Sequence, residues 1–139
     1  MKYMILHYAS QADYDAMAGK DTASGPAWQP EEVAALGEFM GKWSAELVES
    51  GEFVGGYGLA APMLTRRVGQ QGGEQVVTDG PFAETTEVVV GFMIVDCASF
   101  DRATEIAAKL ADTPAPEHVR SRAYVDVRPI MDGMAEITA

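Results

Sequence analysis

The turn around Asp79 holds the first candidate for chemistry in this 139-residue sequence. Asp79 precedes Gly80 and Pro81, after a β-branched run that ends at Thr78 and before the apolar run Val88–Val95. A carboxylate at the end of a strand, beside a pocket between sheet and helix, can act as a general base when burial raises its pKa. Asp before Gly also braces turns by accepting backbone hydrogen bonds. Both roles remain open for Asp79.

His7 is the second catalytic candidate, near the end of the apolar run Tyr3–Tyr8. A histidine at this place can move protons near neutral pH. Buried histidines are more often hydrogen-bonded core or interface residues. His7 and Asp79 can meet only if the first strand lies near the turn, which the sequence does not determine.

Other polar side chains suit substrate binding. Glu84 and Glu87 flank the turn and can bind an amine or pair with Asp79, although solvated or salt-bridged carboxylates are the rule. Arg128 can hold an acidic ligand or neutralise neighbouring acids. Tyr57 can line a pocket or pack in a dimer interface. We therefore predict substrate contacts from Tyr57, Glu87 and Arg128.

Several kinds of site are missing from the sequence. The histidines His7 and His118, with the single cysteine Cys97, do not form a spaced set of metal ligands. The glycines at 55, 56 and 58 lack the Lys of a phosphate loop, so they favour a bent strand. We predict neither a metal nor a cofactor.

The composition indicates one globular domain with an acidic surface. The chain is 47% hydrophobic and 22% charged, with a formal net charge of -11. This charge argues against binding nucleic acid or an anionic membrane, both of which require clustered Lys and Arg. The sequence shows no membrane-length apolar run, and one cysteine fits a reducing compartment. We predict a cytoplasmic protein.

The hydrophobic pattern predicts two helices and six strands. One helix begins at Pro30 and ends before Gly51, and the second has Ser99 as its N-cap. The segment Ala9–Gln29 is either a functional loop or contains a short helix. The expected strands are Tyr3–Tyr8, Phe53–Leu59, Leu64–Val68, Glu74–Thr78, Val88–Asp96 and Arg122–Ile130. This order predicts a ferredoxin-like α+β domain over residues 1–130, with an antiparallel sheet, two helices on one face, and a tail at 131–139.

The two most apolar strands imply a covering partner. Tyr3–Tyr8 and Val88–Val95 are apolar at nearly every position, which is typical of strands buried on both faces. Two helices cover only one face of the sheet. A second copy is the simplest cover for the other, so we predict a homodimer through the sheet face.

Ordered segments of the chain resemble the DGPF group of the YCII-related domain family. They are the motif Asp79–Thr85 with Gly91-Phe92 after it, the opening strand Lys2–Leu6, the segment Gly51–Leu59 and the closing segment Val125–Ile130. The resemblance implies a dimeric α+β barrel. Many relatives carry a histidine on the first helix that is proposed to act with an aspartate, and this chain has none between Pro30 and Ser50.

The resemblance implies several functions and leaves open whether the protein is an enzyme. One is a small-molecule-binding protein that acts as a cofactor-free lyase or isomerase. Asp79 would then move a proton, with His7, Tyr57 and Arg128 around the substrate. The alternative is a non-catalytic binding or regulatory module, since DGPF-type domains resemble proteins found in the context of alternative sigma factors. A stable dimer with a vestigial site is the third.

Overall fold

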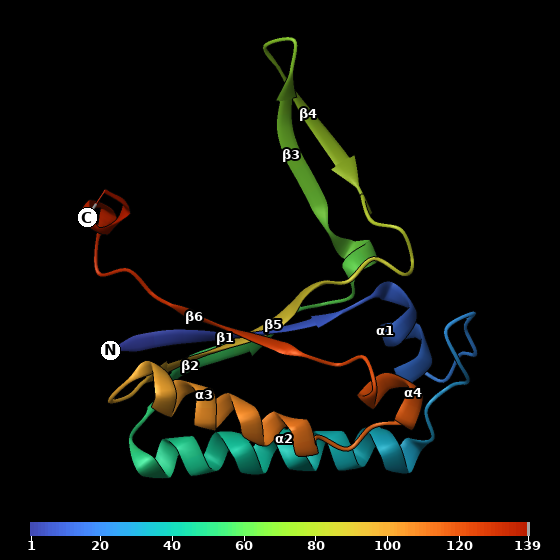
Figure 1. Cartoon of the computed structure of the whole chain (residues 1–139). Coiled ribbons are helices and arrows are strands. Elements are labelled where there is room, and N and C mark those ends of the chain that lie inside the picture. Colours follow the sequence, from blue (N-terminus) through green and yellow to red (C-terminus); the bar gives the residue numbers. More distant parts are fainter. Residues whose placement is uncertain (139) are drawn as a thin grey trace.

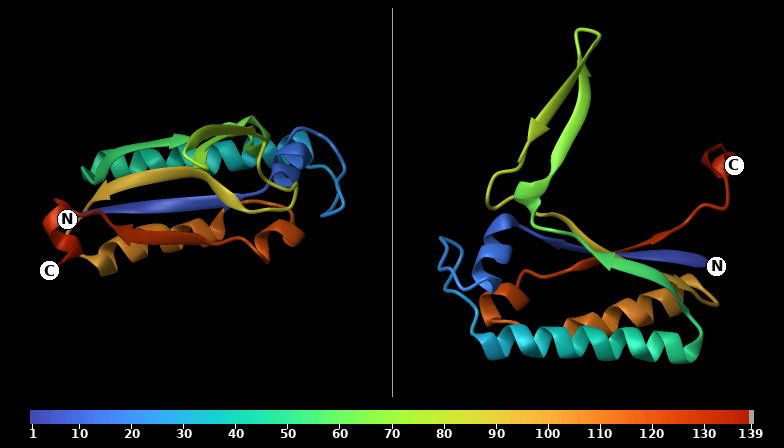
Figure 2. Two further views of the ribbon diagram at one scale, coloured as in Figure 1. Left: turned by 90° about the horizontal axis from the view of Figure 1, so that it is seen from above. Right: turned by 180° about the vertical axis from the view of Figure 1, so that it is seen from behind.

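Four strands form one antiparallel sheet in the computed structural model, which describes residues 1–138 (Figure 1). Their order is β2-β5-β1-β6, so that each of the two βαβ halves contributes one central and one edge strand. Helices α2 (Pro30–Ser50) and α3 (Phe100–Ala108) cover one face (Figures 1 and 2). The predicted ferredoxin-like α+β fold is confirmed. The strands are β1 (Lys2–Ala9), β2 (Phe53–Gly58), β5 (Val88–Asp96) and β6 (Val125–Pro129).

Local sequence signals fix the ends of both long helices. Glu32 accepts a hydrogen bond from the backbone N–H of Gln29 at 2.8 Å, and α2 ends at Gly51, whose φ is 79°. Ser99 Oγ accepts from the backbone N–H of Arg102 at 3.0 Å and caps α3. The chain continues past α3 as the 3₁₀ helix η2 (Lys109–Asp112). The predicted ends of α2 and the predicted N-cap of α3 are thus confirmed.

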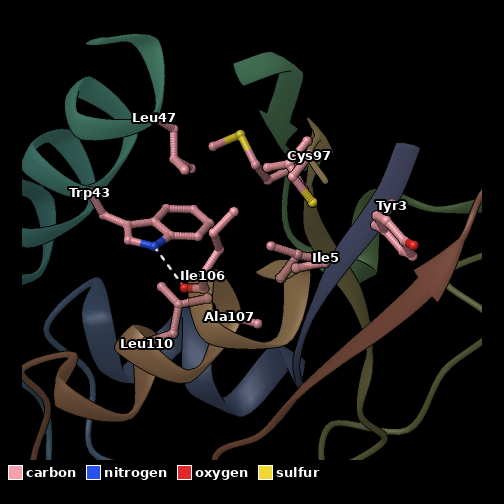
Figure 3. Packing of buried hydrophobic residues seen from close by; sticks show 11 residues of the cluster. Tyr3, Ile5, Trp43, Leu47, Cys97, Ile106, Ala107 and Leu110 are labelled. Carbon is pink, nitrogen blue, oxygen red and sulfur yellow. Dashed lines mark hydrogen bonds between the residues drawn. The ribbon is translucent and has the colours of Figure 1, made fainter. Parts of the chain in front are cut away.

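The core lies between the helices and one face of the sheet (Figure 3). Trp43 contributes most from α2, and its indole N–H donates to the carbonyl oxygen of Ile106 at 3.2 Å. Ala103, Ile106 and Ala107 of α3 and Leu110 of η2 are buried in the same core. The cluster comprises Tyr3, Ile5, Trp43, Leu47, Met93, Val95, Cys97, Ala103, Ile106, Ala107 and Leu110.

Short elements complete the chain. The segment Ala9–Gln29 contains the helix α1 (Gln11–Met17), as one of its two interpretations predicted. The one-turn helix α4 (Glu117–Arg120) was not predicted. The last strand begins after it at Val125, three residues later than the predicted Arg122. The 3₁₀ helices η1 (Pro62–Leu64) and η3 (Met134–Ile137) are the others. Residues 131–138 of the predicted tail are exposed, and Ala139 lies outside the described residues.

Two strands form a separate hairpin between β2 and β5. Strand β3 (Arg66–Gln71) pairs with β4 (Glu74–Asp79), and all their residues are exposed. Gly72 and Gly73 form the turn with φ values of 61° and 82°, as a tight hairpin turn requires. The hairpin rises from the sheet on the side opposite the helices (Figures 1 and 2). We call residues 66–79 the hairpin arm.

The second face of the sheet has no helix over it in the described part of the chain (Figure 1). Strand side chains alternate between the faces, so the neighbours of the buried residues Tyr3, Ile5, Met93 and Val95 point away from the helices. We call this surface the open sheet face. Its residues are Lys2, Met4, Leu6, Tyr8, Tyr57, Phe92, Ile94, Asp96, Asp126 and Arg128.

Candidate functional site

Two of the predicted substrate-binding residues, Tyr57 and Arg128, lie on the open sheet face, on its opposite edge strands β2 and β6. Arg128 lies opposite Met4 across the β1–β6 pair, and Tyr57 lies opposite Phe92 across the β2–β5 pair. Opposed residues of antiparallel strands share a face of the sheet. The Tyr57 and Phe92 rings are 6.1 Å apart between centroids, and Tyr57 is 74% exposed. An apolar surface bordered by Tyr57 and Arg128 suits a ligand with an apolar body and a polar end.

A tyrosine pair and a carboxylate extend this face beyond the predicted residues. The Tyr8 hydroxyl donates to Asp126 Oδ2 at 2.8 Å, and this hydrogen bond raises the pKa of Tyr8. The rings of Tyr8 and Tyr124 are stacked with centroids 5.2 Å apart. The sequence analysis missed Tyr8 and Asp126 as a pair because 118 positions separate them. The alternation of Asp126 with the apolar residues Val125 and Val127 was the one available signal.

An ion cluster fixes the end of the sheet beside this tyrosine pair. Arg122 donates to the buried carboxylate of Asp13 on α1 at 2.7 Å and lies 3.7 Å from Glu87. Burial alone would raise the pKa of Asp13, but hydrogen bonds from Arg122 and Ser10 outweigh it and lower that pKa. The cluster therefore joins α1 to the segments that lead into β5 and β6. Glu87, predicted to bind substrate, contacts Arg122 here.

Asp79 lies at the base of the hairpin arm. Its carboxylate is 3.3 Å from Nε of Arg66, its strand partner, and its side chain is 80% exposed. The following turn is closed by the backbone N–H of Gly80, which donates to the carbonyl oxygen of Thr65 at 2.9 Å. Phe82 is only half-buried and lies under the guanidinium of Arg67, 5.0 Å from its ring centroid. Phe82 thus lies outside the core cluster.

His7 belongs to the other side of the sheet. It alternates with Leu6 and points toward the helices, where its ring meets Trp43 edge-on with 6.3 Å between centroids. Burial lowers the pKa of His7, so the neutral imidazole dominates at pH 7. Because the hairpin arm rises on the opposite side, the structure does not bring His7 together with Asp79.

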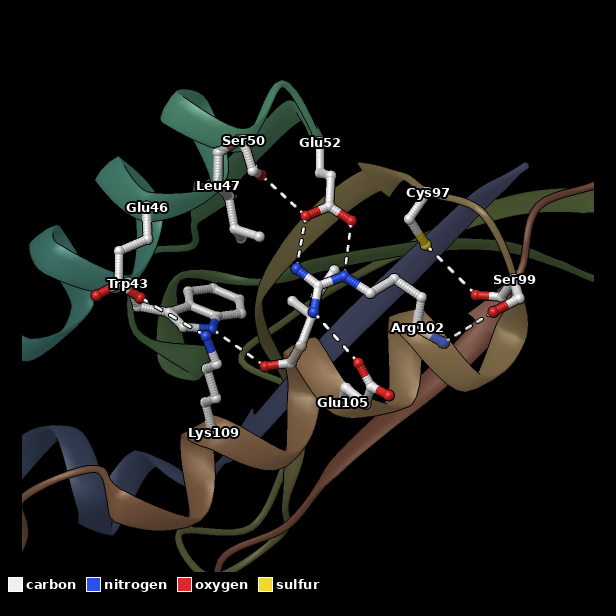
Figure 4. Close-up of polar contacts among 11 residues, drawn as sticks. Trp43, Glu46, Leu47, Ser50, Glu52, Cys97, Ser99, Arg102, Glu105 and Lys109 are labelled. Carbon is white, nitrogen blue, oxygen red and sulfur yellow. Dashed lines mark hydrogen bonds and ion pairs between the residues drawn. The ribbon is translucent and has the colours of Figure 1, made fainter.

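A groove of ≈ 280 Å³ lies on the outer surface between α2 and α3 (Figure 4). Arg102 donates to both carboxylate oxygens of Glu52 at 2.9 and 2.7 Å, and this pair lowers the pKa of Glu52 to about 2. Glu105 also accepts from Arg102, and Lys109 lies 3.8 Å from Glu46. These charges are paired within the chain.

Two further findings concern other kinds of site. Within residues 1–138, three or more His, Cys, Asp or Glu side chains do not gather where they could hold a metal ion. Over the same part of the chain, the helices are too short or too polar to cross a membrane.

Two comparisons with known proteins agree with the fold. The model of the YCII-related domain family matches residues 1–128, which takes in every helix from α1 to α4. A protein of Rhizobium meliloti (strain 1021), described as uncharacterized, is 31% identical over 99 residues. Those residues are 71% of this chain and 80% of that protein.

The Glu52–Arg102 pair predicts a specific dependence of stability on pH. The pKa of Glu52 falls from its ordinary 4.5 to about 2 in the folded chain. Its stabilisation is therefore complete above pH 4.5 and is lost as the pH falls through about 2. We expect the difference in free energy of unfolding between wild type and Glu52→Gln to shrink over this range in urea titrations. Glu49→Gln, at an exposed site on α2, is the control. A difference that stays constant down to low pH would contradict this role.

Proposed function

The chain belongs to the YCII-related domain family, and we propose that it is a small-molecule-binding protein that works as a homodimer through the open sheet face. The observation that carries the proposal is the uncovered face itself. Met4, Leu6 and Ile94 lie on the two central strands of the sheet without a helix over them. Contiguous apolar surface of this kind marks an interaction site in proteins that fold in water.

The distribution of charge supports a second copy as the cover. The net charge of -11 opposes self-association over most of the molecule. The charges of the open sheet face are nevertheless balanced, with Asp126 and Arg128 on β6 and Lys2 opposite Asp96 at the end of the β1–β5 pair. Two copies can therefore meet there without bringing like charges together. A twofold axis would let each face bury the other.

The border of the same face supports a ligand. Tyr8, Tyr57 and Tyr124 present hydroxyl groups beside aromatic and aliphatic carbon, and Arg128 adds a positive charge. Small-molecule sites combine an apolar lining with a few such polar groups. A small cyclic or aromatic compound that carries an acidic group matches this combination.

Catalysis by a cofactor-free lyase or isomerase mechanism is the finer part of the proposal. In an isomerase, Asp79 would take a proton from one atom of the substrate and return it at another. In a lyase, it would take the proton as the bond to the leaving group breaks, and the proton would then pass to the leaving group or to water. Neither reaction consumes a cofactor. The position of Asp79 supports this choice over His7, since the hairpin arm rises on the side of the open sheet face and His7 points to the helices.

Charge placed in the open sheet face is expected to separate the two copies. In Ile94→Asp, each interface would bury two unpaired carboxylates, which is costly without a partner. We expect a shift from dimer to monomer in size-exclusion chromatography with light scattering. Val48→Asp on α2 adds the same charge at a residue that is 60% exposed, and should remain dimeric. A dimeric Ile94→Asp would refute the face as the interface.

The role of Asp79 is tested by Asp79→Asn in an assay found by screening small cyclic and aromatic compounds for turnover. Loss of a positioned base should lower kcat by about 10²- to 10⁴-fold and leave the melting temperature nearly unchanged, because the Arg66 pair is exposed. The control is Glu49→Gln, which removes one exposed carboxylate from α2. Unchanged turnover with an intact fold would exclude Asp79 as the acid or base.

A non-catalytic regulatory module is the second candidate, and the acidic outer surface of α2 favours it. Glu31, Glu38 and Glu49 are exposed along this helix. Such a surface would attract a basic protein partner by long-range charge, and salt would weaken the complex. We expect capture from lysate at low salt, release at high salt, and loss of capture when these three residues are changed to Gln. Capture that survives both tests would exclude this surface.

A further inference from the structure

The hairpin arm makes few contacts with its own chain. Val68 and Val77 lie opposite each other on one side of it, and they are 64% and 53% exposed. The arm is joined to the body at its base, where Gly80 bonds to Thr65 and Arg67 covers Phe82. Two-stranded hairpins are marginally stable in water without a surface to pack on. The valine pair therefore gives the arm an apolar side that has no surface of its own chain to pack on.

The length of the arm exceeds the separation of two packed sheets. Each of its strands has six residues, which at about 3.3 Å per residue gives a reach of about 20 Å. Two sheets stacked face to face lie about 10 Å apart. The arm rises on the side of the open sheet face (Figures 1 and 2). In a dimer through that face, it therefore extends past the partner's sheet and runs beside the partner.

The charge of the arm also fits a second copy of this acidic chain. Arg66 and Arg67 balance Glu74 and Asp79, so the arm is neutral within a chain of net charge -11. The outer surface of α2 carries exposed acids and would repel its own copy. The arm and the open sheet face are thus the two neighbouring surfaces on which copies can meet without net repulsion.

We propose that each hairpin arm packs against the second copy through Val68 and Val77, so that the border of each open sheet face is built by two chains. This inference rests on the proposed homodimer. It places Asp79 and Arg66, at the base of the arm, on the boundary between the subunits. Any ligand that reaches Asp79 would then be enclosed by both copies, and the site would be incomplete in a monomer.

The test compares two valine substitutions of matched exposure by sedimentation equilibrium. Val77→Asp puts charge on the packing side of the arm, and we expect the dimer dissociation constant to rise at least about tenfold. Val48→Asp puts the same charge on α2 and should leave it unchanged. A second variant replaces residues 68–77 with an Asn-Gly turn between Arg67 and Thr78, which shortens the arm and removes the valine pair. It should weaken the dimer similarly.

The outcomes separate this inference from the proposed function. If Ile94→Asp is monomeric but Val77→Asp and the shortened arm dimerise like wild type, the arm does not hold the partner and the homodimer stands. If wild type is a monomer, both fail. Hydrogen exchange tests the same inference with the arm sequence unchanged. The backbone amides of the arm should exchange at least about tenfold more slowly in the wild-type dimer than in monomeric Ile94→Asp. Equal rates would overturn the inference.

Discussion

The central strands β1 and β5 are apolar on both faces, whereas the helices α2 and α3 can cover only one. On the covered side, Tyr3, Ile5 and Val95 are fully buried against the helices. On the open sheet face, residues of the same chemistry, such as Leu6 and Ile94, have no helix over them within residues 1–138. Apolar surface left in water raises the free energy of the folded chain in proportion to its area. The open sheet face therefore favours a partner that covers it, and the other elements are arranged around that face.

The segments that rise above the open sheet face are attached at the ends of the sheet. The hairpin arm leaves one end of the sheet, and the chain beyond β6 leaves the other on the same side (Figure 1). The ion cluster of Asp13, Arg122 and Glu87 fixes the first end by joining α1 to the strands β5 and β6. The ends of the open sheet face are thus held in place, and its centre is left uncovered. This is the geometry expected for a surface that receives a partner and a ligand.

Local patterns sufficed for the two long helices and the strands of the sheet, but not for the short helix α4 or for long-range contacts. Proline and glycine at the ends of α2, and Ser99 before α3, are read within one helical turn, so those helices were predictable. The Glu52–Arg102 pair spans 50 positions and the Asp13–Arg122 pair 109, and such distances carry no local signal. His7 was placed correctly on its strand, but its direction toward Trp43 depends on the register with the buried Ile5. For the same reason, the sequence could not determine whether Asp79 and His7 lie close together.

Whether the open sheet face is covered in solution can be measured directly. A soluble gadolinium chelate broadens the NMR signals of methyl groups that it can approach. If a second copy covers the face, the methyls of Met4, Leu6 and Ile94 should be protected as well as those of buried Ile106, while exposed Val48 is broadened. Broadening of Met4, Leu6 and Ile94 to the same extent as Val48 would contradict the account.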